Sequence, residues 1–381
     1  MSEMSYLEKL LDGVEVEWLP LGHIAAIKTG QSVNKNMISK NPGVYPVINS
    51  GREPLGFINT WNTDNDPIGI TTRGAGVGSV IWQEGKYFRG NLNYSITIDK
   101  KNHINIRYMY HALLHMKNDI HELCTFDGIP ALNAGSLKKL LIPIPCPDNP
   151  EKSLAIQSEI VRILDKFTAL TAELTAELTA ELTMRKKQYN YYRDQLLNLE
   201  GRENTREMRI GDIYDFQYGT GNTIPKSGGQ YPVYGSNGIV GSHDKYNSED
   251  SPVIGHIGAY AGIVNWGQGK HFVTYNGVIC RHKSKEVLQK YAYYLLLLQD
   301  FGSKSNSASQ PFVSYNILNA PIVLVPPLQE QARIVAILDK FDTLTNSITE
   351  GLPREIELRQ KQYEYYRDLL FSFPKPETAS N

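Results

Sequence analysis

Apolar positions follow two different spacings along this chain. In residues 160–197 and 334–371 they recur every three or four positions, which predicts two long helices. The two stretches are copies, because the motifs LDKF and KQY recur at a separation of 174 residues with nothing inserted between them. The first copy also contains three consecutive TAEL tetrapeptides, residues 171–182. One such unit lengthens a helix by about 6 Å, so the repeat is typical of a spacer of adjustable length.

The apolar positions of the two predicted helices correspond pair by pair. The pairs are Phe167 and Phe341, Leu170 and Leu344, Leu174 and Ile348, Leu178 and Leu352, and Leu182 and Ile356. A step of four residues drifts by about 40° on an α-helix, so these positions form a winding stripe. We expect the two helices to bury their stripes against each other as an antiparallel pair. Gly351 and Pro353 predict a kink or break in the second helix.

Short β-type runs, interrupted by Gly, Asn and Pro, fill residues 20–147 and 208–327. Each of these blocks also contains one helical segment, residues 106–123 and 287–298. The blocks are diverged copies, since Gly74, Gly78 and Trp82 of the first correspond to Gly258, Gly262 and Trp266 of the second. The paired glycines indicate a tight turn in each block, because the stretch lacks the Lys-Ser/Thr of a phosphate-binding loop.

Residues 5–13 predict a short helix that stops at Gly13 and resembles the end of the long helices. The chain ends are therefore expected to meet, with the two halves related by a pseudo-two-fold axis. The predicted fold class is α/β: two tandem α/β domains separated by two long helices paired as an antiparallel coiled coil. The expected boundaries are 1–150 for the first domain with the N-terminal helix, 151–207 for the first helical region, 208–327 for the second domain, and 328–381 for the second helical region and tail.

Composition and charge exclude few classes of protein. The 381 residues are 41% hydrophobic with a net charge of −1, and both β-rich blocks contain more Lys and Arg than Asp and Glu. The three cysteines, Cys124, Cys146 and Cys280, form no CxxC pattern, and the nine histidines show no closely paired ligand spacing. No apolar run reaches membrane-spanning length, and the N-terminus is acidic. We therefore expect a cytoplasmic protein with no metal site and no membrane partner.

The helical motifs I-V-x-I-L-D-K-F and K-Q-Y-x-Y-Y-R-D, with YPV in both blocks, make the chain resemble the specificity subunit of type I restriction–modification enzymes. The TAEL repeats are similar to those of the IC subgroup, in which repeat number sets the spacing between DNA half-sites. The resemblance implies that each block is a target recognition domain for one half of an asymmetric double-stranded DNA site. It also implies that the helices set the spacing and dock two modification subunits, through which restriction subunits join the complex.

In such a complex this chain would be non-catalytic. Adenine methylation with S-adenosylmethionine, and DNA cleavage driven by ATP with Mg²⁺, would belong to the partner subunits. Two other interpretations remain open. A self-contained methyltransferase or nuclease would need motifs that the chain lacks, such as DPPY or a P-loop. A structural coiled-coil scaffold with domains that do not bind DNA is disfavoured only weakly, by basic and Asn-rich loops.

Polar and basic side chains in the loops are the candidates for DNA contact, because Arg suits guanine and Asn suits adenine. In the first block the candidates are Lys28, Gln31, Asn34, Lys35, Ser50, Arg52, Thr72, Arg73, Arg89, Asn91 and Asn93. In the second block they are Asn222, Lys226, Ser236, Asn237, His243, Lys245, His256, Tyr260, Tyr275 and Asn276. We expect Arg52, Arg73 and Asn237 to contribute most, and part of the set to be solvated turn residues.

Equivalent polar and aromatic residues near the ends of the two long helices are the candidates for docking the modification subunits. They are Tyr189, Tyr192, Arg193 and Asp194 in the first helix and Tyr363, Tyr366, Arg367 and Asp368 in the second. The alternative for these residues is packing within the chain. Gln157 and Gln331, three residues before the two Ile-Val pairs, are expected to belong to the helix starts.

Overall fold

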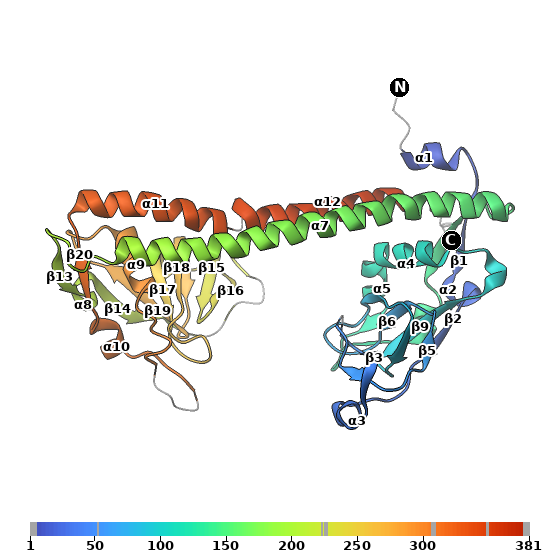
Figure 1. Ribbon diagram of the computed structural model, residues 1–381, viewed down its shortest axis with the longest axis horizontal. Helices are drawn as coiled ribbons and strands as arrows, with labels where there is room; N and C mark the ends of the chain where they lie inside the picture. The colour runs from blue at the N-terminus through green and yellow to red at the C-terminus, as the bar shows by residue number, and fades with distance from the viewer. Residues whose placement is uncertain are drawn as a thin grey trace. The chain divides into compact units, whose positions relative to one another are not determined.

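The computed structural model describes residues 6–51, 53–221, 224, 228–305, 310–347 and 350–375 (Figure 1). The chain divides into two compact units, which are described separately. Unit 1 comprises residues 1–177 and 356–381, and unit 2 comprises residues 178–355. Each unit contains one β-rich block and a segment from each helical region. The described residues contain no helix long and apolar enough to cross a lipid bilayer.

Unit 1 begins with α1 (Tyr6–Leu11), which ends where Asp12 and Gly13 adopt positive φ angles of 46° and 72°, as predicted. Strand β1 (Val16–Pro20) then pairs antiparallel with β12 (Leu141–Pro145). Two four-stranded sheets form the block. The first has the order β2 (Ala25–Thr29), β9 (Asn93–Ile98), β6 (Ile68–Thr71), β7 (Val80–Trp82); the second has the order β4 (Phe57–Ile58), β3 (Pro42–Ile48), β8 (Lys86–Arg89), β5 (Thr63–Asp64).

Unit 2 contains one six-stranded sheet with the corresponding plan. Its order is β14 (Tyr214–Tyr218), β19 (Gly277–His282), β17 (Ser248–Gly255), β18 (Val264–Val273), β15 (Tyr231–Gly235), β16 (Gly238–His243). Strand β15 runs parallel to β18, just as β3 runs parallel to β8 in unit 1. Strand β13 (Arg206–Arg209) pairs antiparallel with β20 (Ile322–Val325), as β1 does with β12. The duplication inferred from the sequence is therefore present in the strand pairing.

Short elements complete the two blocks. In unit 1 they are α2 (Leu21–Ile24), α3 (Lys35–Lys40), the 3₁₀ turn Lys100–Asn102, α4 (Ile106–His115), α5 (Lys117–Glu122), β10 (Cys124–Thr125), β11 (Ala131–Leu132) and α6 (Ala134–Leu137). In unit 2 they are α8 (Ile210–Ile213), α9 (Gln289–Leu297) and α10 (Tyr315–Asn319). Helices α4 and α5 together occupy the stretch predicted as one helix, with a break at Met116.

The long helix α7 (Pro150–Leu197) is continuous through all three TAEL units. The second helical region divides into α11 (Leu328–Asn346) and α12 (Gly351–Leu370), which confirms the predicted break. Gly351 has a φ of 77°, a conformation that favours glycine, and a Cβ there would lie 2.6 Å from the Thr343 carbonyl oxygen. Pro353 is tolerated because it lies in the first turn of α12, where no intrahelical N–H bond is lost.

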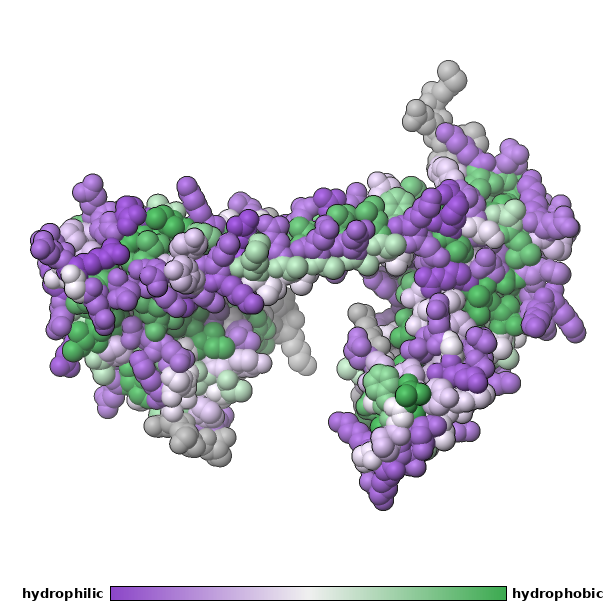
Figure 2. Space-filling view, viewed as in Figure 1, coloured by the Kyte–Doolittle hydropathy of each residue, from purple (hydrophilic) through white to green (hydrophobic). Residues whose placement is uncertain are grey.

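The two helical regions pack against each other within each unit. In unit 1 the ring of Phe167 stacks on Tyr366 at 4.9 Å, and Thr168 donates a hydrogen bond to the Tyr363 hydroxyl at 3.2 Å. In unit 2 Tyr192 stacks on Phe341 at 5.7 Å. The leucines of this winding stripe on α7 are less buried than we expected. Leu170 is 51% exposed, and the TAEL leucines Leu174, Leu178 and Leu182 are half-buried. Hydrophobic residues along α7 reach the surface in Figure 2. One partner helix can cover only one side of another, so a winding stripe is partly left in solvent.

Each β-rich block is fixed to its helix by an equivalent cation. Arg107 lies over the Trp82 and Tyr110 rings, at 4.5 and 5.0 Å, and pairs with Asp165 of α7 at 3.0 Å. In unit 2 the corresponding residues are Lys290 over Trp266 and Tyr293, paired with Asp339 of α11. Cation–π contact and ion pairing act together at both places.

The two predicted helix-start glutamines are fully buried and make equivalent bonds. Gln157 Oε1 accepts a hydrogen bond from the Asn105 amide, at the start of α4, at 2.8 Å. Gln331 Oε1 accepts from the Leu288 amide, at the start of α9, at 2.7 Å. Each glutamine thus satisfies an N–H group that the short helix leaves unpaired, and each orients a block helix relative to a long helix.

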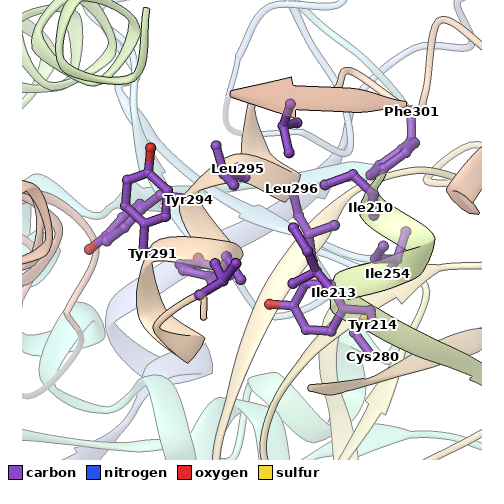
Figure 3. Packing of buried hydrophobic residues seen from close by; sticks show 14 of the residues in the cluster. Ile210, Ile213, Tyr214, Ile254, Cys280, Tyr291, Tyr294, Leu295, Leu296 and Phe301 are labelled. Carbon is purple, nitrogen blue, oxygen red and sulfur yellow. The ribbon is translucent and has the colours of Figure 1, made fainter. Parts of the chain in front are cut away.

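The two ends of the chain share one hydrophobic cluster in unit 1. Leu7 and Leu11 of α1 belong to the same cluster as Leu370 and Phe371, and Trp18 Nε1 donates to the carbonyl oxygen of Pro374 at 2.7 Å. The prediction that the ends meet is confirmed for the described residues. The main cluster of unit 2 joins the strands and α9. Figure 3 shows part of it: Ile210, Ile213, Tyr214, Ile254, Cys280, Tyr291, Tyr294, Leu295, Leu296 and Phe301.

Candidate nucleic-acid interface

Five loops of the first block are joined by backbone hydrogen bonds into one continuous surface. The Gln31 amide donates to the Arg89 carbonyl at 3.0 Å and the Gly90 amide to the Ile48 carbonyl at 2.7 Å. The Thr72 amide donates to the Leu92 carbonyl at 2.9 Å, and the Thr72 carbonyl accepts from the Leu132 amide at 2.8 Å. We call this the first loop surface. The positions on it that we compare are Thr29, Gln31, Ser50, Thr72, Arg73, Asn91 and Ala134, of which all but Thr72 are exposed or half-buried.

The second block repeats the same bonds one for one. The backbone amides of Thr220, Thr274 and His256 donate hydrogen bonds. Their acceptors are the carbonyl oxygens of Val273, Tyr234 and Asn276, in that order. The Val313 amide donates to the His256 carbonyl at 2.9 Å, as the Leu132 amide does to the Thr72 carbonyl. We call this shared set of backbone hydrogen bonds the backbone frame. This second loop surface has as its equivalent positions Tyr218, Thr220, Ser236, His256, Ile257, Tyr275 and Tyr315. The two surfaces therefore share a backbone frame but carry different side chains.

The paired glycines form the tight turns that the sequence predicts. Gly74 and Gly78 have φ angles of 90° and 79°, and Gly258 and Gly262 have 91° and 89°. At Gly262 a Cβ would also collide with the backbone of Gly302. These turns allow strands β6 and β17 to reverse direction immediately beside the loop surfaces.

Several predicted DNA-contacting residues of the first block lie on its loop surface. Gln31, Arg73 and Asn91 are exposed and Ser50 is half-buried. Lys28, on β2, is also exposed. The remaining exposed candidates are at the start of α3, where Asn34 caps the helix by accepting from the Met37 amide at 2.8 Å and Lys35 is the first helical residue.

Arg89 and Asn93 were predicted to contact DNA, but both side chains are buried in the first block. Arg89 is 3% exposed, and its guanidinium donates hydrogen bonds to Asn93 Oδ1 and to backbone carbonyls that include Asp66, at 2.8 Å. Burial lowers the pKa of Arg89 and raises the pKa of the neighbouring Tyr87 to about 12. These side chains hold the first block together from inside. Thr72, 8% exposed, also presents little side chain to solvent.

In the second block, Asn237, Lys245, Tyr260 and Tyr275 are exposed, while Ser236 and Asn276 are half-buried. His243 is half-buried and stacks on Phe272 at 4.6 Å. His256 is buried within an aromatic stack. Its Nδ1 donates to the Tyr275 carbonyl at 3.1 Å. Arg52, Asn222 and Lys226 lie outside the described residues.

Two aromatic residues on the second loop surface, Tyr218 and Tyr315, were not among the candidates. Their equivalents in the first block are Thr29 and Ala134, at matching places in the backbone frame. A signal for Tyr218 was present in the sequence, since it precedes Gly219 as Thr29 precedes Gly30. Tyr315 could not be aligned from sequence alone because the loops before it differ in length.

The docking candidates on the helices divide by burial. Tyr189 and Arg367 are 6% and 5% exposed, so their side chains pack within the chain as in our alternative interpretation. Tyr363 and Tyr366 are half-buried against α7, and Arg193 lies over the Tyr189 ring. Tyr192, Asp194 and Asp368 are exposed. The most exposed tyrosines of the repeated motif are its other pair, Tyr191 and Tyr365, at 61% and 63%.

The described part of the chain contains no group of three or more His, Cys, Asp or Glu side chains placed to hold a metal ion. Cys124 and Cys280 are buried, and desolvation raises the pKa of both thiols. Raised thiol pKa values disfavour the nucleophilic thiolate.

The molecule is a duplicated binding protein, in which two loop surfaces on one backbone frame are attached to paired helices. The family model of the type I restriction modification DNA specificity domain matches residues 13–184 and 202–358. The chain belongs to this family.

Curated relatives extend over the whole chain. The specificity subunit of the type I restriction enzyme EcoR124I/EcoR124II from Escherichia coli is 41% identical, with 100% of each chain covered. The EcoprrI specificity subunit, also from E. coli, is 36% identical over 92% of this chain and 93% of its own length.

Two solved structures share the fold. The type I restriction-modification S subunit from M. genitalium has a TM-score of 0.51 at 21% identity, covering 98% of this chain and 100% of its own. A chain from a structural study of type I R-M complex assembly and conformational transition has a TM-score of 0.57 at 15% identity, covering 93% and 97%. At these identities the likeness concerns the fold alone.

Proposed function

We propose that this chain is the DNA-recognition subunit of a type I restriction–modification complex. Each loop surface binds one half of an asymmetric, interrupted double-stranded site. The observation that carries the proposal is the pair of loop surfaces with one backbone frame and different outward side chains. A shared frame places each surface against the same kind of ligand, and different side chains suit different base sequences.

The chain supplies recognition in this proposal, and its partners supply the chemistry. Exposed cations such as Lys28 and Arg73 contact phosphates, and exposed polar groups such as Asn91 and Asn237 contact base edges. Adenine methylation with S-adenosylmethionine occurs in two modification subunits, and ATP- and Mg²⁺-dependent cleavage occurs in restriction subunits. The chain itself is non-catalytic.

Selection from a randomised duplex library tests this function. We expect the chain, together with modification subunits, to enrich one bipartite sequence with a fixed gap, and its affinity to fall steeply with added salt. Exchanging residues 22–145 for the block of a relative should change one half-site only. Enrichment of no sequence, with binding indifferent to the duplex used, would contradict DNA recognition and favour a scaffold whose domains bind other ligands.

We further propose that Tyr191 and Tyr365 each provide the centre of a docking surface for one of the two modification subunits. They are equivalent in the repeat, highly exposed, and flanked by Tyr192 and Tyr366, whose rings contact the partner helix. Tyrosine is enriched at the energetic centres of protein interfaces, because it buries a large rigid area at low entropic cost.

Replacing both tyrosines with alanine is expected to weaken binding of the modification subunit more than tenfold, at the level typical of interface hot spots. The melting temperature should change little, since both side chains are exposed. Met184→Ala is the matched control, because Met184 is also exposed on α7 at 50%. Calorimetric titration measures the affinity. Equal affinities for the double variant, the control and the wild type would place the docking surface elsewhere.

A further inference from the structure

Three aromatic rings form a continuous stack on the second loop surface. Tyr218 is the central ring, at 4.2 Å and 14° from Tyr315 on one side and at 4.1 Å and 25° from His256 on the other. Tyr275 meets the edge of His256 at 5.1 Å and 79°. These four residues, which we call the aromatic cluster, come from four separate loops or loop ends.

Hydrogen bonds fix the cluster. The Tyr315 hydroxyl accepts a hydrogen bond from the Tyr218 amide at 2.9 Å, and His256 Nδ1 donates to the Tyr275 carbonyl at 3.1 Å. Since a carbonyl oxygen only accepts, the proton on this side of the imidazole is assigned to Nδ1. Four rings held in place lose little further conformational freedom on binding, which is the property of a preorganised recognition site.

The cluster is not required by the backbone frame. The same four positions of the first loop surface are Thr29, Thr72, Asn91 and Ala134, which are small or polar, yet the equivalent backbone bonds form at similar lengths. Two of the rings leave much of their area in solvent: Tyr275 is 46% exposed and Tyr315 is 36% exposed, whereas His256 is buried. Tyr275 and Tyr315 belong neither to the backbone frame nor to the core cluster, so their rings are available for a ligand.

We propose that the aromatic cluster is a specificity determinant of the second half-site, and that it recognises thymine through the 5-methyl group. This rests on the proposed function of the loop surfaces. An apolar ring face accepts the thymine methyl, which no other DNA base carries in the major groove. At the equivalent positions of the first loop surface, the exposed side chains of Thr29 and Asn91 instead suit hydrogen bonding to base edges. The two half-sites thus differ in the chemistry by which they are read.

Deoxyuridine tests the proposal, because it removes only the methyl group. The bipartite site is first selected with the full chain and its modification subunits, and each thymine of the second half-site is then replaced singly. Burying one methyl corresponds to about a fourfold change in affinity. We expect at least one replacement to cost the wild type about fourfold. In Tyr275→Ala or Tyr315→Ala that particular replacement should cost nothing further.

Asn91→Ala is the matched control, since Asn91 is equivalent to Tyr275 but lies on the first loop surface. It should keep the full deoxyuridine effect at the second half-site. Retention of first half-site selectivity by the tyrosine variants shows that they are folded. A second half-site without thymine, or a deoxyuridine effect undiminished in both tyrosine variants, overturns this inference while DNA recognition stands. Selection of no bipartite site overturns both.

Discussion

Replacing Arg89 with methionine is expected to lower the free energy of unfolding by about 3–5 kcal/mol, the range for breaking a buried charged network. The guanidinium bonds Asn93, Tyr87 and the carbonyls of Asp66, Ile68 and Tyr94. Methionine fills much of the same space but donates no hydrogen bonds, so the carbonyls would remain buried without partners. Lysine is expected to rescue little, because one ammonium group cannot reach all of these acceptors.

Arg73→Met makes the matched comparison, since it removes the same charge from an exposed position of the same block. It should leave the melting temperature nearly unchanged and weaken DNA binding instead. Differential scanning calorimetry of both variants, with DNA affinity measured below the transition, distinguishes the two roles. If Arg89→Met had the melting temperature of the wild type and bound DNA as weakly as Arg73→Met, Arg89 would be a direct DNA contact.

Deleting one TAEL unit, residues 175–178, is expected to reduce affinity for the original DNA site more than a hundredfold, because the base pairs of one half-site are lost together. The unit lies inside the continuous helix α7. Its removal shortens the helix by about 6 Å and rotates the C-terminal part of α7 by about 40°. We propose that α7 sets the gap between half-sites, so the deletion variant should select the same half-site sequences with a gap shorter by one or two base pairs.

Thr175→Ala controls for the change in sequence, since it keeps the length of α7, and alanine favours the helix more than threonine does. It should select the original site. Library selection with both variants reads out half-site sequences and gap separately. New half-site sequences in the deletion variant, or an unchanged gap, would rule out α7 as the element that sets spacing.

Local signals account for the parts of the fold that were predictable. Glycine and proline indicated the stop after α1, the break before α12 and the turns beside the loop surfaces, because their backbone preferences act within a few residues. The duplication predicted the two equivalent blocks and the two equivalent helical regions, since two copies of one sequence pattern imply two copies of one structure. The shared plan of β15–β18 and β3–β8 pairing agrees with this.

Side-chain direction was not predictable in the same way. Arg89 lies in a run of Gly, Asn and Arg typical of a DNA-binding loop, but its partners Asp66 and Ile68 are more than twenty residues away. Nothing local to Arg89 reveals that their carbonyls need donors. The burial of the docking candidates was unpredictable for the same reason. Tyr189 and Tyr192 differ in burial because of their contacts with α9 and α11, which come much later in the chain.

In the backbone frame, the groups that hold the loops in place are not the side chains proposed to select the DNA target. Amide and carbonyl groups join the loops, so the outward side chains of Asn91 or Tyr275 are not needed to keep the loops in place. Under the proposed function, we expect substitution at these positions to alter the bound sequence without breaking a structural bond. On this proposal, the protein could acquire new targets by single substitutions while remaining folded at each step, and the two halves could diverge independently. Invading DNA that lacks one target sequence would then meet a recognition surface that can change quickly.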